Sequence, residues 1–497
     1  MYQELSSSTF IGINGFIIKV EVHISNGLPT FNIVGLGDAA VKESKERVRC
    51  AIVNSGFVFP PGKIIVNLSP GNIKKIGTHF DVAMAVSILL ASNQINIDPK
   101  GRIFIGELSL SGEVKPVNGV LPMVIEAFQK NIKNIVLPLD NLKECAILND
   151  INFYPIKHLK DLKKGLKKIV LKKFELTNEQ NYDIDISSIL GHEFAKRGLE
   201  ISAAGKHPLL LIGSPGSGKT MLARSICSIL PNLTKDEAIE VSKIYSIMGL
   251  LKDNNRLSLS PPFRDPHHTT TPIAMVGGGN SLNPGEISLA HNGVLFLDEI
   301  LEFKKAAIEV LRQPIEDSII KISKSYGSLE YPSNFLLIAA LNPCACGYFG
   351  SNLKKCTCSE NDIKNYLKKL SGPIIDRFDM SLSVSSISYD EFTNRKSRSN
   401  ANEIKNRVLN ARERQKFRYK KLDIKYNNQL SGDNLYEFCK LNSESEAFLD
   451  NLYKDFKFSF RSFNNIIKVS RTISDLYDEE FITKAHIAEA LNYKVTI

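Results

Sequence analysis

The first 157 residues alternate hydrophobic and polar positions over short stretches that glycines separate. The clearest stretches are Gly15–Ser25 (GFIIKVEVHIS), Lys63–Pro70 (KIIVNLSP) and Arg102–Val114 (RIFIGELSLSGEV). A period of two is typical of strands with one buried face, and short helical patterns lie between these strands. The pattern predicts a compact α+β domain over residues 1–157.

The apolar periodicity lapses over residues 158–185. This segment starts with the Lys-rich stretch His158–Phe174 (HLKDLKKGLKKIVLKKF), and a polar stretch, ELTNEQNYDID, directly follows it. A lapse of periodicity between two patterned regions indicates a connection. We therefore predict a basic linker over 158–185.

Continuous apolar runs alternate with helical patterns over residues 186–388. The runs are PLLLIG at Pro208, GVLFLDEI at Gly293, NFLLIAALN at Asn334 and DMSLSV at Asp379. Strands buried on both faces and separated by helices are typical of a parallel sheet covered on two sides. We expect an α/β domain here.

Residues 389–497 show helical periodicity to the end of the chain. Apolar positions recur at intervals of three and four in Asn402–Tyr419 (NEIKNRVLNARERQKFRY) and in Phe460–Tyr477 (FRSFNNIIKVSRTISDLY). That spacing is typical of amphipathic helices. A small helical domain is predicted to follow the α/β domain.

The chain has 497 residues and a formal net charge of +10. A basic surface favours an acidic partner such as DNA, because contacts to phosphates release counterions. Two clusters carry much of this charge, His158–Phe174 and Asn394–Lys421. Solvated helix faces, or a genome biased towards lysine codons, would explain the same composition.

The sequence shows no secretory leader at its N-terminus. Its longest apolar run, VAMAVSILLAS at Val82, is too short to span a bilayer. We expect a cytoplasmic protein without a membrane segment.

The stretch Gly213–Thr220 (GSPGSGKT) fits the phosphate-binding pattern G-x-x-x-x-G-K-[ST] at every fixed position. The pattern turns a strand sharply into a helix and aims backbone N–H groups at one point, where they hold phosphate oxygens. A plain glycine turn is the alternative. We predict binding of ATP and Mg²⁺, with Lys219 on the β and γ phosphates and Thr220 on the metal. The predicted nucleotide-binding residues here are Gly213, Ser214, Pro215, Gly216, Ser217, Gly218, Lys219 and Thr220.

A second apolar run ends in Asp298 and Glu299, about eighty residues further along. A strand tip can present such carboxylates to a metal ion and to an attacking water. We expect Asp298 to support Mg²⁺ together with Thr220, and Glu299 to act as the general base.

Two further polar residues follow the later strands. Asn342 ends an apolar run, where it could orient the attacking water, and Arg377 precedes the last run in SGPIIDRFDM. We expect Arg377 to be exposed and to complete the site of a neighbouring subunit. An internal salt bridge with Asp376 or Asp379 is the alternative.

Four of the eight cysteines form two C-x-C pairs in CACGYFGSNLKKCTC, at Cys344, Cys346, Cys356 and Cys358. Tetrahedral thiolate ligation of Zn²⁺ is one interpretation for a cytosolic chain, and free thiols in a loop are the other. The remaining cysteines are scattered and are expected to be buried: Cys50, Cys145, Cys227 and Cys439.

The segment Pro261–Ser288 is rich in Pro and Gly and contains the paired His267 and His268. No third metal ligand lies nearby in the sequence. A structural role or a role in a pore loop is favoured over metal binding.

Several motifs together resemble the AAA+ ATPases of the magnesium-chelatase-like YifB/ComM family, over essentially the whole chain. They are GSPGSGKT, PFRDPHH, PGEISLAHNGVLFLDE, NPCACG, SGPIIDRFD and, near the N-terminus, FNIVGLGDAAVKESKERVRCAIVNSGF. The resemblance implies ring-shaped, hexameric ATPases that bind the nucleotide between subunits. It implies Asn342 as the sensor of the same subunit, Arg377 as the finger from the neighbour and Arg461 as a second sensor from a helical lid. It also implies helicase-like DNA branch migration during natural transformation.

The N-terminal domain resembles the proteolytic domain of Lon proteases, a fold of the ribosomal-S5-domain-2-like type, through GELSLSGEVKPVNGV. His79 stands about where that family places its serine, and Leu121 where it places its lysine. A Ser-Lys protease needs both groups. The resemblance therefore implies a non-proteolytic scaffold or a collar that faces DNA.

Three functions remain open. The first is an ATP-driven ring motor that acts on single-stranded or branched DNA. The second is a chelatase-type motor subunit, against which the N-terminal domain argues. The third is an ATP-regulated scaffold that binds a protein partner.

Overall fold

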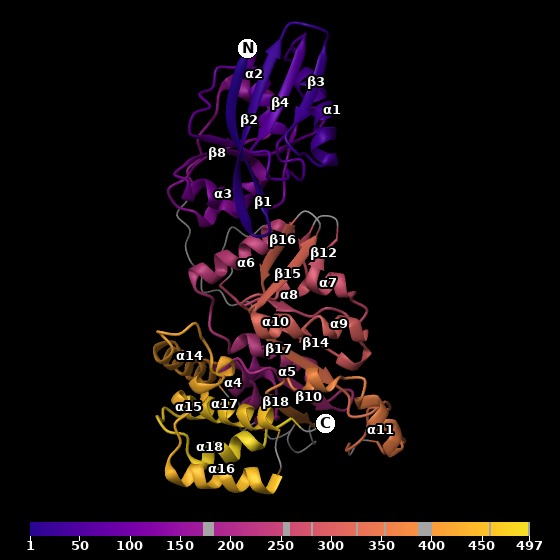
Figure 1. Cartoon of the computed structure of the whole chain (residues 1–497), viewed down its shortest axis with the longest axis vertical. Helices are drawn as coiled ribbons and strands as arrows, with labels where there is room; N and C mark the ends of the chain where they lie inside the picture. The colour runs from indigo at the N-terminus through magenta and orange to yellow at the C-terminus, as the bar shows by residue number, and fades with distance from the viewer. Residues whose placement is uncertain are drawn as a thin grey trace. The chain divides into compact units, whose positions relative to one another are not determined.

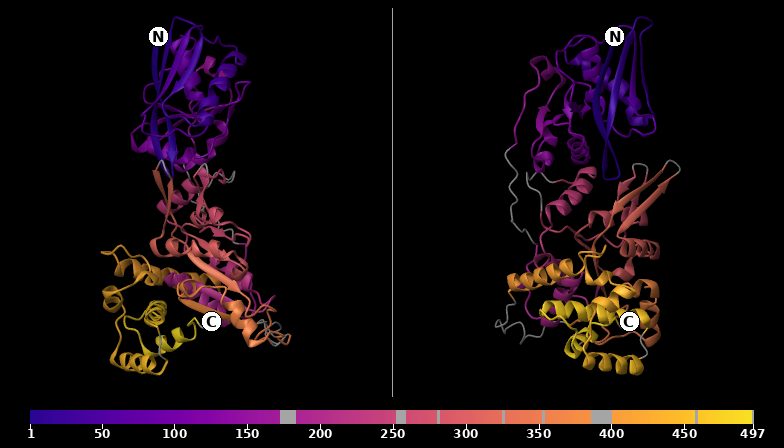
Figure 2. Two further views of the ribbon diagram at one scale, coloured as in Figure 1. Left: turned by 45° about the vertical axis from the view of Figure 1, so that its right-hand side comes forward. Right: turned by 60° about the vertical axis from the view of Figure 1, so that its left-hand side comes forward.

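The computed structural model describes residues 1–171, 183–251, 259–279, 282–324, 327–351, 354–385, 400–456 and 459–495. The chain forms two compact units (Figures 1 and 2). The first comprises Met1–Thr177 and Lys235–Ser258, and the second comprises Asn178–Thr234 and Leu259–Ile497.

The N-terminal unit is built on a mixed seven-stranded sheet in the order β3-β4-β2-β1-β5-β8-β9. Strand β2 is antiparallel to β1 and β4, whereas the remaining neighbours are parallel. A two-stranded ribbon of β6 (Glu107–Leu108) and β7 (Val114–Lys115) stands apart from this sheet. The strands of the main sheet are β1 (Tyr2–Ile11), β2 (Asn14–Ser25), β3 (Thr30–Val34), β4 (Lys63–Ser69), β5 (Arg102–Phe104), β8 (Asn134–Pro138) and β9 (Asn152–Ile156).

Helices cover both faces of this sheet. Phe104 and Val136 share one core with α1 (Ala39–Asn54) and α2 (Asp81–Ala91). Ile103 and Ile135 share another with α3 (Val120–Gln129). Neighbouring strand residues point to opposite faces, so the two cores lie on opposite sides. The predicted α+β domain is confirmed in its element types.

Two segments belong to a different part of the fold from the one that their sequence predicts. The 3-10 helix η3 (Leu159–Lys164) buries Leu159 and Leu162 in the N-terminal core, although it falls in the predicted linker. Helix α6 (Lys235–Ile247) belongs to the N-terminal unit, although its sequence interrupts the α/β region. Residues 172–182 of the predicted linker lie outside the described residues.

The second unit contains a five-stranded, fully parallel sheet in the order β11-β14-β17-β10-β18. Every residue of β14 and β17 is buried, as the continuous apolar runs predict. The α/β class is confirmed. The strands are β10 (Leu209–Gly213), β11 (Phe263–Arg264), β14 (Val294–Leu297), β17 (Leu336–Leu341) and β18 (Met380–Val384).

Helix α4 (Glu193–Gly205) precedes β10, and α5 (Lys219–Ser225) follows it. Between β14 and β17 the chain forms α9 (Lys305–Glu309), α10 (Arg312–Asp317) and an antiparallel hairpin of β15 (Ile319–Lys324) and β16 (Gly327–Pro332). Sequence analysis did not predict this hairpin. Further short elements of this unit are α7 (Pro272–Val276), β12 (Gly277–Gly278), β13 (Asn283–Pro284), α8 (Glu286–Leu289), α11 (Glu360–Leu367) and α12 (Gly372–Ile375).

The C-terminal part is helical, as predicted, and is drawn in yellow and light orange in Figures 1 and 2. Its helices are α14 (Ala401–Arg418), α15 (Asp433–Phe438), α16 (Ser443–Phe456), α17 (Phe460–Leu476) and α18 (Lys484–Leu491). The start predicted for this domain, residue 389, lies outside the described residues, as do the first residues of the basic cluster Asn394–Lys421.

Buried polar contacts attach these helices to the α/β sheet. His207, just before β10, contacts Asp379 through Nδ1 at 2.8 Å and Thr472 of α17 through Nε2 at 2.7 Å. Gln415 of α14 donates to the carbonyl of Ala204 at the end of α4. Within the described parts of the chain, we find no helix with the length and apolar character needed to cross a bilayer.

Candidate functional site

The turn after β10 has the backbone that the phosphate-binding pattern requires. Gly216 and Gly218 adopt φ angles of +77° and +87°, which favour glycine. A Cβ at Gly213 would lie 2.3 Å from the carbonyl oxygen of Val384 on the neighbouring strand. These three glycines therefore permit the tight turn and the close packing of β10 against β18.

The Lys219 side chain folds back over this turn. Its Nζ donates to the carbonyls of Gly213 at 2.7 Å and Ser214 at 2.9 Å, and to Oδ1 of Asn342 at 3.2 Å. Burial lowers the pKa of Lys219, and the nearby charges of Asp298 and Glu299 oppose this shift. The ammonium is thus held at the mouth of the turn by oxygens that phosphate oxygens can replace.

Thr220 and the two carboxylates meet at the tips of β10 and β14. The Thr220 hydroxyl donates to Oδ2 of Asp298 at 2.7 Å, and the Glu299 amide donates to Oδ1 of Asp298 at 3.0 Å. Glu299 has a left-handed backbone, with φ 50° and ψ 49°, and an exposed side chain. Such conformations cost about 1–3 kcal/mol and cluster at functional sites.

The arrangement fits a nucleoside triphosphate with its magnesium ion. The Ser217 hydroxyl is buried in the turn and has no partner among the described residues, so a phosphate oxygen would satisfy it. Thr220 and Asp298 offer oxygen ligands of the kind that Mg²⁺ prefers. When bound, the metal supplies positive charge that neutralises the phosphates during transfer.

Two neighbours of this site were not predicted. Arg224, one turn after Thr220 on α5, donates to Oδ2 of Asp265 at 2.8 Å. Burial raises the pKa of Asp265, and the negative charge of Asp298 adds to the shift. His192 precedes α4, and its Nε2 would lie 3.7 Å from a Cβ at Gly218. The motif PFRDPHH, which contains Asp265, was the available signal.

Arg377 differs from its prediction. Its side chain is only 9% exposed, and it pairs with Glu316 rather than with Asp376 or Asp379. Nη2 lies 2.5 Å from Oε1 of Glu316, and Nη1 donates to the Pro373 carbonyl at 2.6 Å. The expectation of an exposed arginine was wrong because α10 supplies a carboxylate that covers it.

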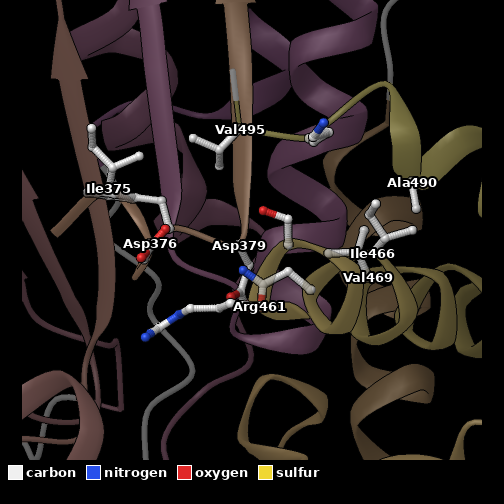
Figure 3. Close-up of a pocket in the computed structure, with 12 residues that line it drawn as sticks. Ile375, Asp376, Asp379, Arg461, Ile466, Val469, Ala490 and Val495 are labelled. Atoms are coloured by element: carbon white, nitrogen blue, oxygen red, sulfur yellow. The ribbon is translucent and has the colours of Figure 1, made fainter. Parts of the chain in front are cut away.

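Arg461 lies in the same neighbourhood as Arg377. It is exposed at the start of α17 and lines a small cavity of about 50 Å³ with Asp376 and Asp379 (Figure 3). Burial lowers the pKa of Arg377, and the positive charges of Arg461 and Arg312 act in the same direction. In the structure, the predicted site residues therefore form two groups. The first contains Lys219, Thr220, Asp298, Glu299 and Asn342, and the second contains Arg377 and Arg461.

Comparison with known proteins places this site in a family. Residues 185–392 match the family model described as magnesium chelatase, subunit ChlI. Residues 20–141 and 398–494 match models for the subunit ChlI of Mg-chelatase and for the ChlI C-terminal region. The chain is 39% identical to YifB of Escherichia coli over 97% of this chain and 95% of that protein. It is 37% identical to the competence protein ComM of Haemophilus influenzae, over 99% of this chain and 97% of that protein.

The chain belongs to the YifB/ComM family of magnesium-chelatase-like AAA+ ATPases. Membership implies ATPase activity with ATP and Mg²⁺, and it confirms the AAA+ core with a C-terminal helical domain.

A partial likeness to Lon proteases accompanies this family assignment. Lon protease 2 of Bacillus subtilis is 27% identical over 35% of this chain and 33% of that protein. The likeness agrees with the predicted Lon-like fold of the N-terminal domain.

His79, at the position where the Lon family places its nucleophile, is buried. His79 is 4% exposed, contacts the Thr9 hydroxyl at 3.2 Å and packs against Phe80. Burial lowers the pKa of His79 to about 3, so the imidazole is neutral at physiological pH. Leu121 is fully buried in α3. Neither side chain offers the chemistry of a Ser-Lys dyad.

The four cysteines of the C-x-C pairs converge directly after Asn342. Their Sγ atoms all lie within 4.8 Å of one another, and three of the pairs are separated by 3.3, 3.5 and 3.7 Å. A disulfide needs about 2.05 Å between sulfurs, whereas thiolates about 2.3 Å from one tetrahedral ion lie about 3.8 Å apart. The cluster thus has the donors and nearly the spacing of a four-thiolate site. Hydrogen bonds from the backbone N–H groups of Thr357 and Tyr348 lower the pKa of Cys346 to about 5.

The other candidate metal ligands, His267 and His268, are not part of the cysteine cluster. His267 is exposed, packs against His268 with tilted rings and contacts the Thr269 hydroxyl. Across the described ranges, the four-cysteine cluster is the one group of three or more His, Cys, Asp or Glu side chains placed to hold a metal. Cys145, Cys227 and Cys439 are buried as expected, but Cys50 is half-buried.

Proposed function

We propose that this chain is an ATP-driven ring motor that acts on DNA, most simply by helicase-like branch migration in recombination or natural transformation. The observation that carries the proposal is the convergence of Lys219, Thr220, Asp298, Glu299 and Asn342 at one edge of the sheet. The full-length likeness to a protein named for competence and the net charge of +10 support DNA as the substrate.

Each residue of this edge has a separate role in the proposal. Lys219 holds the β and γ phosphates, and Thr220 with Asp298 holds the magnesium ion. Glu299 accepts a proton from the attacking water, and Asn342 orients that water. The contact between Asn342 and Lys219 would let the same amide sense whether the γ phosphate is present.

We further propose a homo-oligomeric ring, hexameric as in the related motors, with Arg377 serving the site of a neighbouring subunit and Arg461 of the helical lid acting as a second sensor. A donated arginine stabilises the charge that develops on the transferred phosphoryl group. Arg377 must then exchange its contact with Glu316 for one across the subunit boundary. The nearby positive charge of Arg461 favours that exchange, because it repels the Arg377 guanidinium in its contact with Glu316.

The four cysteines are proposed to hold one Zn²⁺ per chain. Four thiolates are the donor set of structural zinc sites. Metal analysis of the purified protein tests this assignment. About one Zn²⁺ per chain supports it, and metal-free native protein would refute it.

The decisive test of the motor is the ATPase rate with and without a panel of single-stranded, duplex and branched DNA. Stimulation by single-stranded or branched DNA, together with displacement or exchange of strands, is expected. If no DNA structure changes the ATPase rate or the rate of strand exchange, the DNA motor is refuted and a scaffold is favoured.

A chelatase-type motor is the second candidate, because the matching family models carry that description. It predicts ATP-dependent insertion of Mg²⁺ into a porphyrin when partner subunits are present, with no response to DNA. The likeness to YifB and ComM over 97% and 99% of this chain ranks it second.

A further inference from the structure

The four-cysteine loop is in contact with the nucleotide site. A Cβ at Gly347, which lies between Cys346 and Cys356, would be 2.7 Å from Cδ and 2.8 Å from Cγ of Pro215. Pro215 is inside the phosphate-binding turn. The loop therefore packs directly on the proline ring of this turn, at a distance that only glycine allows.

The same loop also leads to the polar tip of β17. Asn342 directly follows that strand, contacts Lys219 at 3.2 Å and stands two residues before the buried Cys344. Cys344 is in turn fixed by the Phe349 amide, which donates to its sulfur at 3.3 Å. One short segment thus joins the cysteine cluster to two parts of the ATPase site.

Residues 343–351 and 354–358 contain no helix and no strand. The backbone hydrogen bonds among these residues are those of local turns, such as the bond from the Gly347 N–H to the Cys344 carbonyl at 2.9 Å. Turns constrain a loop less than a helix or a sheet does, whereas four bonds to one ion would close it and fix its shape.

We propose that the four-cysteine centre is a positioning element of the ATPase: when it holds a metal ion, it fixes Gly347 against Pro215 and Asn342 against Lys219. The inference rests on the proposed ATPase roles and on metal binding by the cysteines. It assigns the metal a task beyond local stability, namely control of nucleotide affinity and turnover.

The first experiment removes the metal from the full chain and uses no DNA. Cys356→Ser with Cys358→Ser, and separately a chelator on the wild type, should release the metal and weaken binding of a fluorescent ATP analogue by about tenfold or more. Cys50→Ser is the control, because that thiol lies outside the cluster. Zinc returned to the chelator-treated wild type should restore the affinity.

The second experiment leaves the cysteines intact. Gly347→Ala and Gly350→Ala are a matched pair, because their φ angles are +82° and +74°, yet a Cβ at Gly350 meets nothing within 4 Å. Gly347→Ala should keep its metal and raise KM for ATP about tenfold, while Gly350→Ala stays within about twofold of wild type. Removal of the metal and Gly347→Ala act through the same contact. Gly347→Ala should therefore weaken ATP binding little further once the metal is gone.

Two results would overturn the proposal. One is a metal-free protein, folded by circular dichroism, that binds and hydrolyses ATP like the wild type. The other is equal ATP affinity in the Gly347 and Gly350 variants. A failure of the DNA motor is seen separately, because it leaves these DNA-free measurements unchanged.

Discussion

Glu144 offers a sharp test of how α6 is held in the N-terminal unit. Its carboxylate accepts hydrogen bonds from the Ser246 hydroxyl of α6 at 2.7 Å and from the Asn141 amide at 2.6 Å. Burial raises the pKa of Glu144 from 4.5 to about 7, and these hydrogen bonds oppose the shift only in part. The folded chain therefore keeps a proton that the unfolded chain loses near pH 4.5.

The sign and size of the effect follow from this difference. Since the folded pKa is raised, the contribution of Glu144 to stability is fully present below about pH 4.5 and is lost as pH rises through about 7. A gap of about 2.5 pH units at about 1.4 kcal/mol per unit gives about 3 kcal/mol. Above about pH 8 no further change is expected from this group.

Glu144→Gln should remove that dependence, because the amide is neutral at every pH and its oxygen can still accept from Ser246. At pH 8 the variant should be more stable than the wild type by up to about 3 kcal/mol, and at pH 5 the two should be similar. Circular dichroism melting between pH 5 and 8 is the suitable assay, because the chain contains no tryptophan.

Hydrogen exchange of the α6 peptide, corrected for intrinsic rates, locates the effect in the molecule. Asp140→Asn is the control, because that carboxylate is exposed. Equal pH profiles for wild type and Glu144→Gln would show that this carboxylate does not carry the predicted charge penalty.

Three further predictions concern the motor. Glu299→Gln should bind ATP yet hydrolyse it about 10²-fold more slowly or worse, since the amide cannot accept a proton from water, and unchanged turnover in folded protein would remove its assignment. Arg377→Ala should lose about 10³-fold in hydrolysis by assembled rings while keeping ATP binding, whereas Glu316→Gln, which frees Arg377, should not. Rings mixed from Arg377→Ala and Lys219→Ala subunits should regain activity, and no recovery in rings shown to be mixed would contradict donation across subunits. DNA affinity should fall by about 10³ between 50 and 200 mM salt with little dependence on base sequence, and a flat salt response would exclude contacts dominated by phosphates.

The phosphate-binding turn could be read from the sequence because its chemistry lies in contiguous residues. Gly213, Gly216 and Gly218 are needed for one backbone path, and the following lysine and threonine have fixed places on it. The strands that carry Asp298 and Asn342 were likewise predicted, because a fully buried strand is a continuous apolar run.

Contacts between distant residues could not be read in this way. Glu316 lies 61 positions from Arg377, so the nearby Asp376 and Asp379 were the only visible candidates. Helix α6 shows an ordinary helical pattern, and such a pattern says which face is buried but not which unit covers it. The hairpin of β15 and β16 was missed although Ile320 and Ile322 alternate with Lys321 and Ser323, because the run is short and half-polar.

Because α6 belongs to the N-terminal unit, neither unit is one continuous segment of the chain. The polypeptide passes from one unit to the other three times, at residues 177–178, 234–235 and 258–259. A single proteolytic cut therefore cannot release an intact N-terminal unit. A truncation that starts at residue 178 would remove Gly119 and Glu144, which hydrogen-bond to Ser246 of α6. If the N-terminal unit were lost or exchanged, by experiment or by gene rearrangement, α6 would remain in the ATPase sequence without the residues that now bind it. Its sequence would then have to change as well, so that it could pack on another surface.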